Sequence, residues 1–235
     1  MLKKYYIVNI GGSNLYINNH LIKHYLKNVL FITGTAYAGK TTLAKMLSEK
    51  YGLILCAENY DCVPDEIITK DKYPNIYYWK TIKNWQEYIS RKPEEFSKWM
   101  MDCIKEHEEF EIAYLMHISK SQKVIVDTGL SVETLREIAD YKQVAVMLSP
   151  QSMSVENYFD RDDLDKVFIK EQIMKTENPE KTMENYLACM AKVNSKEFYD
   201  EWANSGFFTL VRKDTKNDTR QETFKILSRH FDLLK

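Results

Sequence analysis

The residues best suited to chemistry form one short loop, Gly34-Thr35-Ala36-Tyr37-Ala38-Gly39-Lys40-Thr41, which matches the pattern G-x-x-x-x-G-K-[ST]. In this pattern backbone N–H groups surround phosphate oxygens, the lysine reaches the β- and γ-phosphates, and the following hydroxyl ligates Mg²⁺. A chance match in a chain of this composition is expected at roughly 0.3%. The sequence therefore predicts a site for a polyphosphate with Mg²⁺. Its predicted binding residues are Gly34, Thr35, Ala36, Tyr37, Ala38, Gly39, Lys40, Thr41 and Thr42.

A buried strand and a helix must hold this loop, and the sequence supplies both. The apolar run 29–32 precedes the loop, and Leu43, Met46 and Leu47 begin a helical pattern after it. Continuous apolar runs suit a parallel sheet that is covered on both faces. We therefore predict an α/β three-layer sandwich with a mainly parallel five-stranded sheet. Its other predicted strands are 53–56, 124–126, 144–148 and 207–211, and Gly11-Gly12 predicts an N-terminal β-hairpin.

Acidic residues follow two of these predicted strands. Asp127 ends the run Val124-Ile125-Val126, and Glu58 and Asp61 follow Cys56. Ligands of open parallel sheets bind at the carboxyl ends of the strands. We predict that Asp127 joins Thr41 in holding Mg²⁺. Glu58 and Asp61 are the acidic candidates for binding a ligand at the end of the 53–56 strand.

On these residues the chain resembles the P-loop NTPases, and within them the small-kinase group of nucleoside and nucleotide, shikimate and gluconate, and zeta-toxin-like kinases. The loop lies near the N-terminus, the domain is small, and a polar segment precedes the last strand, where those kinases carry a lid. The resemblance implies a five-stranded parallel sheet between helices, and ATP or GTP with Mg²⁺. It also implies a carboxylate after the second strand that binds the substrate or acts as a base, so that either Glu58 or Asp61 would accept the proton of a substrate hydroxyl or orient that hydroxyl. Both residues qualify, and we favour Asp61 because it could reach over the glycine-containing loop.

The candidate lid is the charged segment 154–178. Lids of the resembling kinases use arginines to neutralise charge on the transferring phosphoryl group. Here Arg161 is the arginine of the segment, and residues 156–181 carry five basic against eight acidic side chains. Lys166 and Lys170, four residues apart, would share a helical face and assist Arg161.

The segment 61–120 is the predicted helical region that binds the acceptor, the molecule that would receive the phosphoryl group. It is rich in tyrosine and tryptophan, which could stack on a base or sugar or simply pack in a core. Arg91 could meet an acceptor phosphate or carboxylate. Arg136, after the Asp127 strand, is a further candidate cation.

Composition limits the class of protein. The 33 Lys and Arg residues balance 34 Asp and Glu, so a broad nucleic-acid-binding surface is not expected. No apolar stretch is long enough for a membrane span. The cysteines show no metal-ligand spacing, which favours reduced thiols and a cytoplasmic protein. We predict one domain, 1–235, with residues 1–28 as a hairpin extension.

These features predict a P-loop kinase that transfers a phosphoryl group to a small-molecule acceptor. Lys40 and the loop amides would stabilise charge, Asp61 or Glu58 would position the acceptor, and Arg161 would close over the phosphates. An alternative is a regulatory ATPase or switch whose output is a contact with a partner. A nucleotide-binding module without turnover is a third possibility.

Overall fold

The computed structural model of the chain describes residues 6–10, 13–57, 60–156, 158–160, 164–212 and 218–234. The strands are β1 (Tyr6–Ile10), β2 (Ser13–Ile17), β3 (Val29–Gly34), β4 (Ile54–Cys56), β5 (Val124–Asp127), β6 (Val144–Leu148) and β7 (Phe208–Val211). The α-helices are α1 (Asn19–Tyr25), α2 (Lys40–Tyr51), α3 (Pro74–Lys80), α4 (Trp85–Ile89), α5 (Pro93–Ile118), α6 (Val132–Ile138), α7 (Gln151–Val155), α8 (Leu164–Met174), α9 (Pro179–Val193), α10 (Lys196–Ala203) and α11 (Arg220–His230). Short 3₁₀ helices cover Leu26–Asn28, Asp65–Ile67 and Tyr141–Gln143.

The five strands β4-β5-β3-β6-β7 form one sheet in that order, and all of its pairs are parallel. The strand before the loop 34–41, which we call the phosphate loop after its predicted role, is β3. It is central, with β5 and β6 as its neighbours. The predicted five-stranded parallel sheet is confirmed. Strands β1 and β2 pair antiparallel as a separate two-stranded sheet, and the Gly11-Gly12 turn lies outside the described residues.

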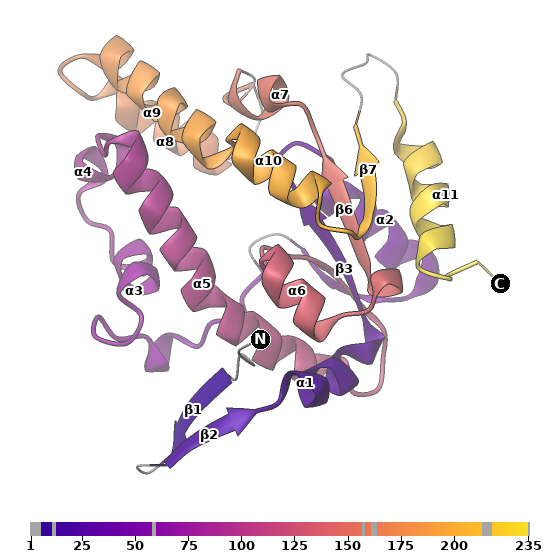
Figure 1. Cartoon of the computed structure of the whole chain (residues 1–235). Helices are drawn as coiled ribbons and strands as arrows, with labels where there is room; N and C mark the ends of the chain where they lie inside the picture. Colours follow the sequence, from indigo (N-terminus) through magenta and orange to yellow (C-terminus); the bar gives the residue numbers. More distant parts are fainter. Residues whose placement is uncertain are drawn as a thin grey trace.

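Helices cover both faces of the sheet (Figure 1). On one face α2 and α11 pack through Leu43, Leu47 and Leu227. On the other face α1, α5, α6 and α10 contribute a second core, with Leu115 and Trp202 among its buried side chains. Side chains alternate along β3, so neighbouring residues serve opposite cores. This two-sided burial explains why the strand is continuously apolar in sequence.

A helical lobe made of α3, α4, α8, α9 and the first half of α5 extends from one edge of the sheet (Figure 1). Its core is aromatic, and Tyr88, Phe96, Trp99 and Tyr186 are all buried there. Most aromatic residues of the predicted acceptor region therefore pack as core. Trp79, whose residue surface is 47% exposed, lies at the rim of this cluster.

Candidate active site

Gly34, the last residue of β3, brings the loop close to β6. Its φ is +119°, and a Cβ added to it would lie 2.1 Å from the carbonyl oxygen of Met147. The next residue, Thr35, donates its backbone N–H to that same carbonyl at 3.0 Å. The close approach of two backbones therefore requires glycine here.

Two further residues give the loop its curvature. Gly39, with φ of +89°, precedes the first residue of α2, so the loop runs directly into the helix N-terminus. Tyr37 also has a positive φ, of +65°, which is uncommon for a residue with a Cβ and costs on the order of 1–2 kcal/mol. The Arg212 guanidinium donates to the Tyr37 carbonyl at 2.7 Å, and this contact helps to hold the strained residue in place.

A serine after β6 also fixes the loop. The backbone N–H of Ser149 donates to the Thr35 hydroxyl at 2.7 Å, and the Ser149 hydroxyl donates to the Ala36 carbonyl. Both residues are buried. Sequence reasoning missed Ser149, although its place directly after an apolar strand, next to the loop strand, was an available signal.

Lys40, Thr41 and Asp127 meet at the start of α2. The Lys40 ammonium donates to the Thr35 carbonyl at 3.1 Å and lies 3.9 Å from Asp127 Oδ1. The Thr41 hydroxyl donates to Asp127 Oδ2 at 2.6 Å. The register of β3 and β5, in which Ile32 faces Asp127, produces this meeting. A hydroxyl and a carboxylate are oxygen ligands of the kind Mg²⁺ prefers, so this pair fits that ion.

Two carboxylates, Asp61 and Glu58, were predicted to follow the strand that is now β4. Asp61 follows β4 at the edge of the sheet and is exposed. Glu58 lies outside the described residues. Their assignment as acceptor-positioning groups stays a prediction.

The lid candidate approaches the loop through Tyr37. The Tyr37 hydroxyl donates to the Tyr158 carbonyl at 2.7 Å. The Lys166 ammonium lies 5.2 Å from the centre of the Tyr37 ring and 5.3 Å from that of Tyr158, within cation–π range. Lys166 and Lys170 both line a cavity of about 610 Å³ along α8. Arg161 lies outside the described residues, so its predicted role is untested.

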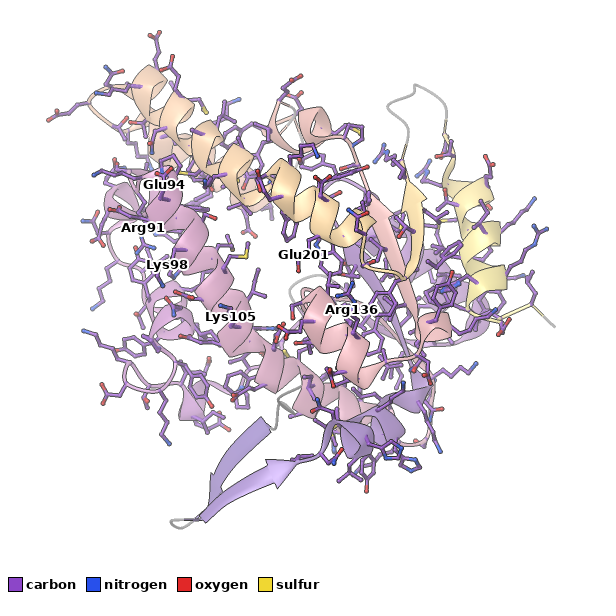
Figure 2. The ribbon with its side chains drawn as sticks, in the orientation of Figure 1. Arg91, Glu94, Lys98, Lys105, Arg136 and Glu201 are labelled. Carbon is purple, nitrogen blue, oxygen red and sulfur yellow. The ribbon has the colours of Figure 1, made fainter. Side chains whose placement is uncertain are left out.

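Two arginines considered as anion-binding groups have structural contacts instead. The Arg91 guanidinium lies 4.2 Å from the centre of the Tyr78 ring and 5.3 Å from that of Trp99. Arg136 reaches from α6 toward the end of α10 and donates to the Ser205 carbonyl at 2.8 Å (Figure 2). Arg91 therefore packs against the aromatic cluster, and Arg136 secures the end of α10.

Sequence reasoning also missed Glu111, a buried carboxylate in the middle of α5. Its residue surface is 3% exposed, and it lies between Tyr60, which follows β4, and Thr128, which follows β5. Burial raises the pKa of Glu111 to about 7, while the nearby Thr128 and Tyr60 hydroxyls oppose part of that shift. Its position in an amphipathic helix gave no sign that it would be buried beside two strand ends.

A Glu111→Gln substitution is expected to change how stability depends on pH. Unfolding lowers the Glu111 pKa from about 7 to its ordinary value of 4.5, so between these values the folded state binds more protons. The wild-type chain therefore loses stability as pH rises from 4.5 to 7, by about 3 kcal/mol. The variant lacks this loss, so its free energy of unfolding relative to wild type should rise by that amount between pH 4 and pH 8. Urea unfolding at the two pH values measures it, and parallel curves for the two proteins would contradict it.

The comparison with known proteins found similarity to solved structures and to nothing else. No family model matches the chain, and no curated protein matches it. The chain is structurally similar to shikimate kinase from Acinetobacter baumannii in complex with shikimate, with 18% identity, a TM-score of 0.41, and coverage of 88% of this chain and 95% of that one. It is also similar to a protein of Chloroflexus aurantiacus J-10-fl described as a putative kinase, with 10% identity, a TM-score of 0.39, and coverage of 87% and 96%.

The strand order itself places the phosphate loop within an α/β fold of the predicted kind. The loop follows the central strand of an all-parallel five-stranded sheet, and helices cover both faces. No helix in the described part of the chain has the length and apolar character needed to cross a bilayer.

Proposed function

We propose that this protein is a kinase that transfers the γ-phosphoryl group of ATP or GTP to a small-molecule acceptor. The observation that carries the proposal is the convergence of Lys40, Thr41 and Asp127 at a loop that opens a helix. The ammonium and the helix N-terminus would bind a polyphosphate, and the pair of oxygen ligands would bind its metal ion. A cytoplasmic location belongs to the same proposal.

The reaction is mainly a matter of positioning and electrostatics. An acceptor oxygen forms a bond to the γ-phosphorus, the bond from that phosphorus to the β,γ-bridging oxygen breaks, and ADP or GDP leaves with the electron pair. The acceptor proton passes to Asp61 or Glu58. Thr41 and Asp127 would hold Mg²⁺, which supplies charge neutralisation on the β- and γ-phosphates when bound.

Cations around the loop would stabilise the transferring group. Lys40 acts from the loop itself. Lys166 acts from α8, where it already lies against Tyr37, and Arg161 would close from the same segment. The Tyr37 ring and hydroxyl then connect the phosphate loop to the lid. Closing of the lid would therefore move groups that contact the phosphates.

The test is ADP release from ATP and Mg²⁺ across a panel of small alcohols and nucleotides. We expect ADP to form in step with a phosphorylated acceptor. Asp61→Asn should lower kcat at least about 100-fold with ATP affinity unchanged, because general-base assistance contributes 10²–10⁴-fold. Glu58→Gln, the matched control, should have a smaller effect, and the reverse ranking would assign the base to Glu58.

Other outcomes separate the alternatives. Slow ADP release at the same rate with and without every acceptor would favour the regulatory ATPase or switch. Tight ATP binding with no ADP release under any condition would favour a binding module. Both results would contradict the proposed kinase.

A further inference from the structure

Two buried polar groups at the carboxyl ends of β4 and β5 have no hydrogen-bond partner among the described residues. They are Glu111 Oε1 and the Tyr60 hydroxyl. The two lie close enough for the hydroxyl to oppose the raised pKa of Glu111, but neither atom reaches hydrogen-bond geometry with the other. Glu111 is 3% exposed, and Tyr60 packs against Tyr114 with ring centres 5.5 Å apart. Leaving such groups unsatisfied is costly, and native proteins seldom do so without a reason.

The neighbouring histidine does not satisfy Glu111. His107 Nδ1 lies 3.8 Å from Glu111 Oε2, beyond hydrogen-bond length, and His107 Nε2 lies 3.4 Å from Cys62 Sγ. Burial lowers the pKa of His107, which favours its neutral form. Glu111 therefore keeps unused hydrogen-bonding capacity on a side chain held rigidly by the core.

These groups lie next to the proposed metal site, which an exposed glycine follows in the chain. Thr128, whose hydroxyl neighbours Glu111, directly follows Asp127 in the chain. The residue after it, Gly129, is exposed, and a Cβ added to it would meet nothing within 4 Å. Gly129 is therefore the exposed residue that follows the proposed metal ligand Asp127 and the Glu111 neighbour Thr128 in the chain.

The surroundings of the pair are acidic. Asp127 acts on Glu111 electrostatically, as does Glu108, which accepts hydrogen bonds from the Ser131 backbone N–H at 2.8 Å and the Thr134 hydroxyl at 2.9 Å. Lys80 acts electrostatically on His107 and is paired with Asp65, and Lys40 lies beside Asp127. An anionic acceptor group would meet repulsion here.

Four arginines in the described part of the chain are occupied elsewhere. Arg91 stacks on aromatic rings, Arg136 binds the Ser205 carbonyl, and Arg212 binds the Tyr37 carbonyl. Arg220 pairs with Asp218. None of these four supplies the bidentate clamp with which proteins usually hold a phosphate or carboxylate.

We infer that Glu111 and Tyr60 bind a hydroxyl or amino group of the acceptor, and that the acceptor is an alcohol or amino alcohol without phosphate or carboxylate groups. This inference rests on the proposed kinase function. The Tyr60 hydroxyl donates to an acceptor oxygen, and Glu111 Oε1 accepts from an acceptor O–H or ammonium. Both unmatched atoms then gain partners, and the acidic surroundings select against anions.

The experiment uses matched pairs of probes that differ in one anionic group: ribose and ribose 5-phosphate, glucosamine and glucosamine 6-phosphate, and myo-inositol and an inositol monophosphate. ADP release from ATP and Mg²⁺ is measured with each. We expect the unphosphorylated member of at least one pair to be used with kcat/KM at least about tenfold above its partner, since discrimination by buried polar groups is of this size or larger.

Variants then test the two residues with the best probe. Glu111→Gln and Tyr60→Phe should each raise KM for the acceptor about tenfold and leave KM for ATP unchanged, because each loses one hydrogen bond to the acceptor alone. Glu109→Gln, on the exposed side of α5, and Tyr114→Phe, beside Tyr60, are the matched controls and should leave both constants unchanged. Tyr60→Phe keeps the test decisive if Glu111→Gln folds poorly.

The outcomes are distinguishable. Use of the phosphorylated probes alone, or equal KM values for the variants and their controls, would overturn this inference and leave phosphoryl transfer standing. ADP release that no acceptor stimulates would overturn the proposed function as well.

Discussion

A Gly34→Ala substitution is expected to destabilise the fold by about 4 kcal/mol or more, which is exceptional for one methyl group. The added Cβ would lie 2.1 Å from the Met147 carbonyl oxygen and 2.9 Å from the Met147 carbonyl carbon and backbone nitrogen. These are backbone atoms of the neighbouring strand β6, which is buried and cannot move aside cheaply. The φ of +119° adds strain for any residue with a Cβ.

Urea unfolding of the variant and wild type measures this loss, and Gly129→Ala is the matched control. Position 129 also follows a strand of the sheet, but its added Cβ meets nothing within 4 Å and its φ is not in the left-handed region. The control should therefore be neutral or gain up to about 1 kcal/mol from a less flexible unfolded chain. Equal stabilities for the two variants would contradict the close packing of Gly34 against β6.

A Lys40→Ala substitution is expected to abolish turnover or nucleotide binding. The ammonium lies between the Thr35 carbonyl and Asp127, where the phosphates of a bound nucleotide would replace the loop carbonyl as its partner. Loss of a preorganised charge aimed at the transferring group typically costs 10²–10³-fold in kcat, and lost binding adds to this in kcat/KM. Calorimetric titration with ATP and Mg²⁺, together with an ADP-release assay, measures both effects.

Lys45→Ala provides the control for Lys40. Lys45 lies on the same helix but is exposed, so its removal should leave nucleotide affinity and turnover at the wild-type level. Wild-type affinity and turnover for Lys40→Ala would refute the assignment of the phosphate loop. A loss of both in Lys45→Ala would indicate general damage to α2 instead.

The phosphate loop could be predicted because its residues are contiguous. The apolar strand, the glycines and the first turn of α2 are neighbours in the chain, so local rules relate their types to their conformations. Tyr37 shows the limit of those rules. Its type gives no sign of a positive φ, and its hydrogen bond to Tyr158 joins residues far apart in the chain.

The contact between Thr41 and Asp127 could be predicted only in part, because it joins two segments that are distant in the chain. An apolar run that ends in an acid indicates a strand end, and a parallel sheet gathers such ends at one edge. The sequence did not say which strands would be neighbours. The register that sets Ile32 opposite Asp127 depends on the whole sheet.

The contacts of Arg91 and the burial of Glu111 could not be predicted from sequence patterns. Arg91 had the type of an anion-binding residue, but it stacks on Tyr78 because a helical lobe brings that ring beneath it. Glu111 had the type of a solvated helix residue, but packing of α5 against the ends of β4 and β5 removes it from water.

By itself, the sequence determined the phosphate loop, the alternation of strands and helices, and the chemical types available at the strand ends. Those properties follow from the periodicity and conformational preferences of nearby residues. The tertiary structure alone decided which carboxylate is buried, which arginines are occupied, and how the segment 154–178 contacts the loop. Burial and electrostatics at one point are set by every element that packs around it, and these elements are distant in the chain.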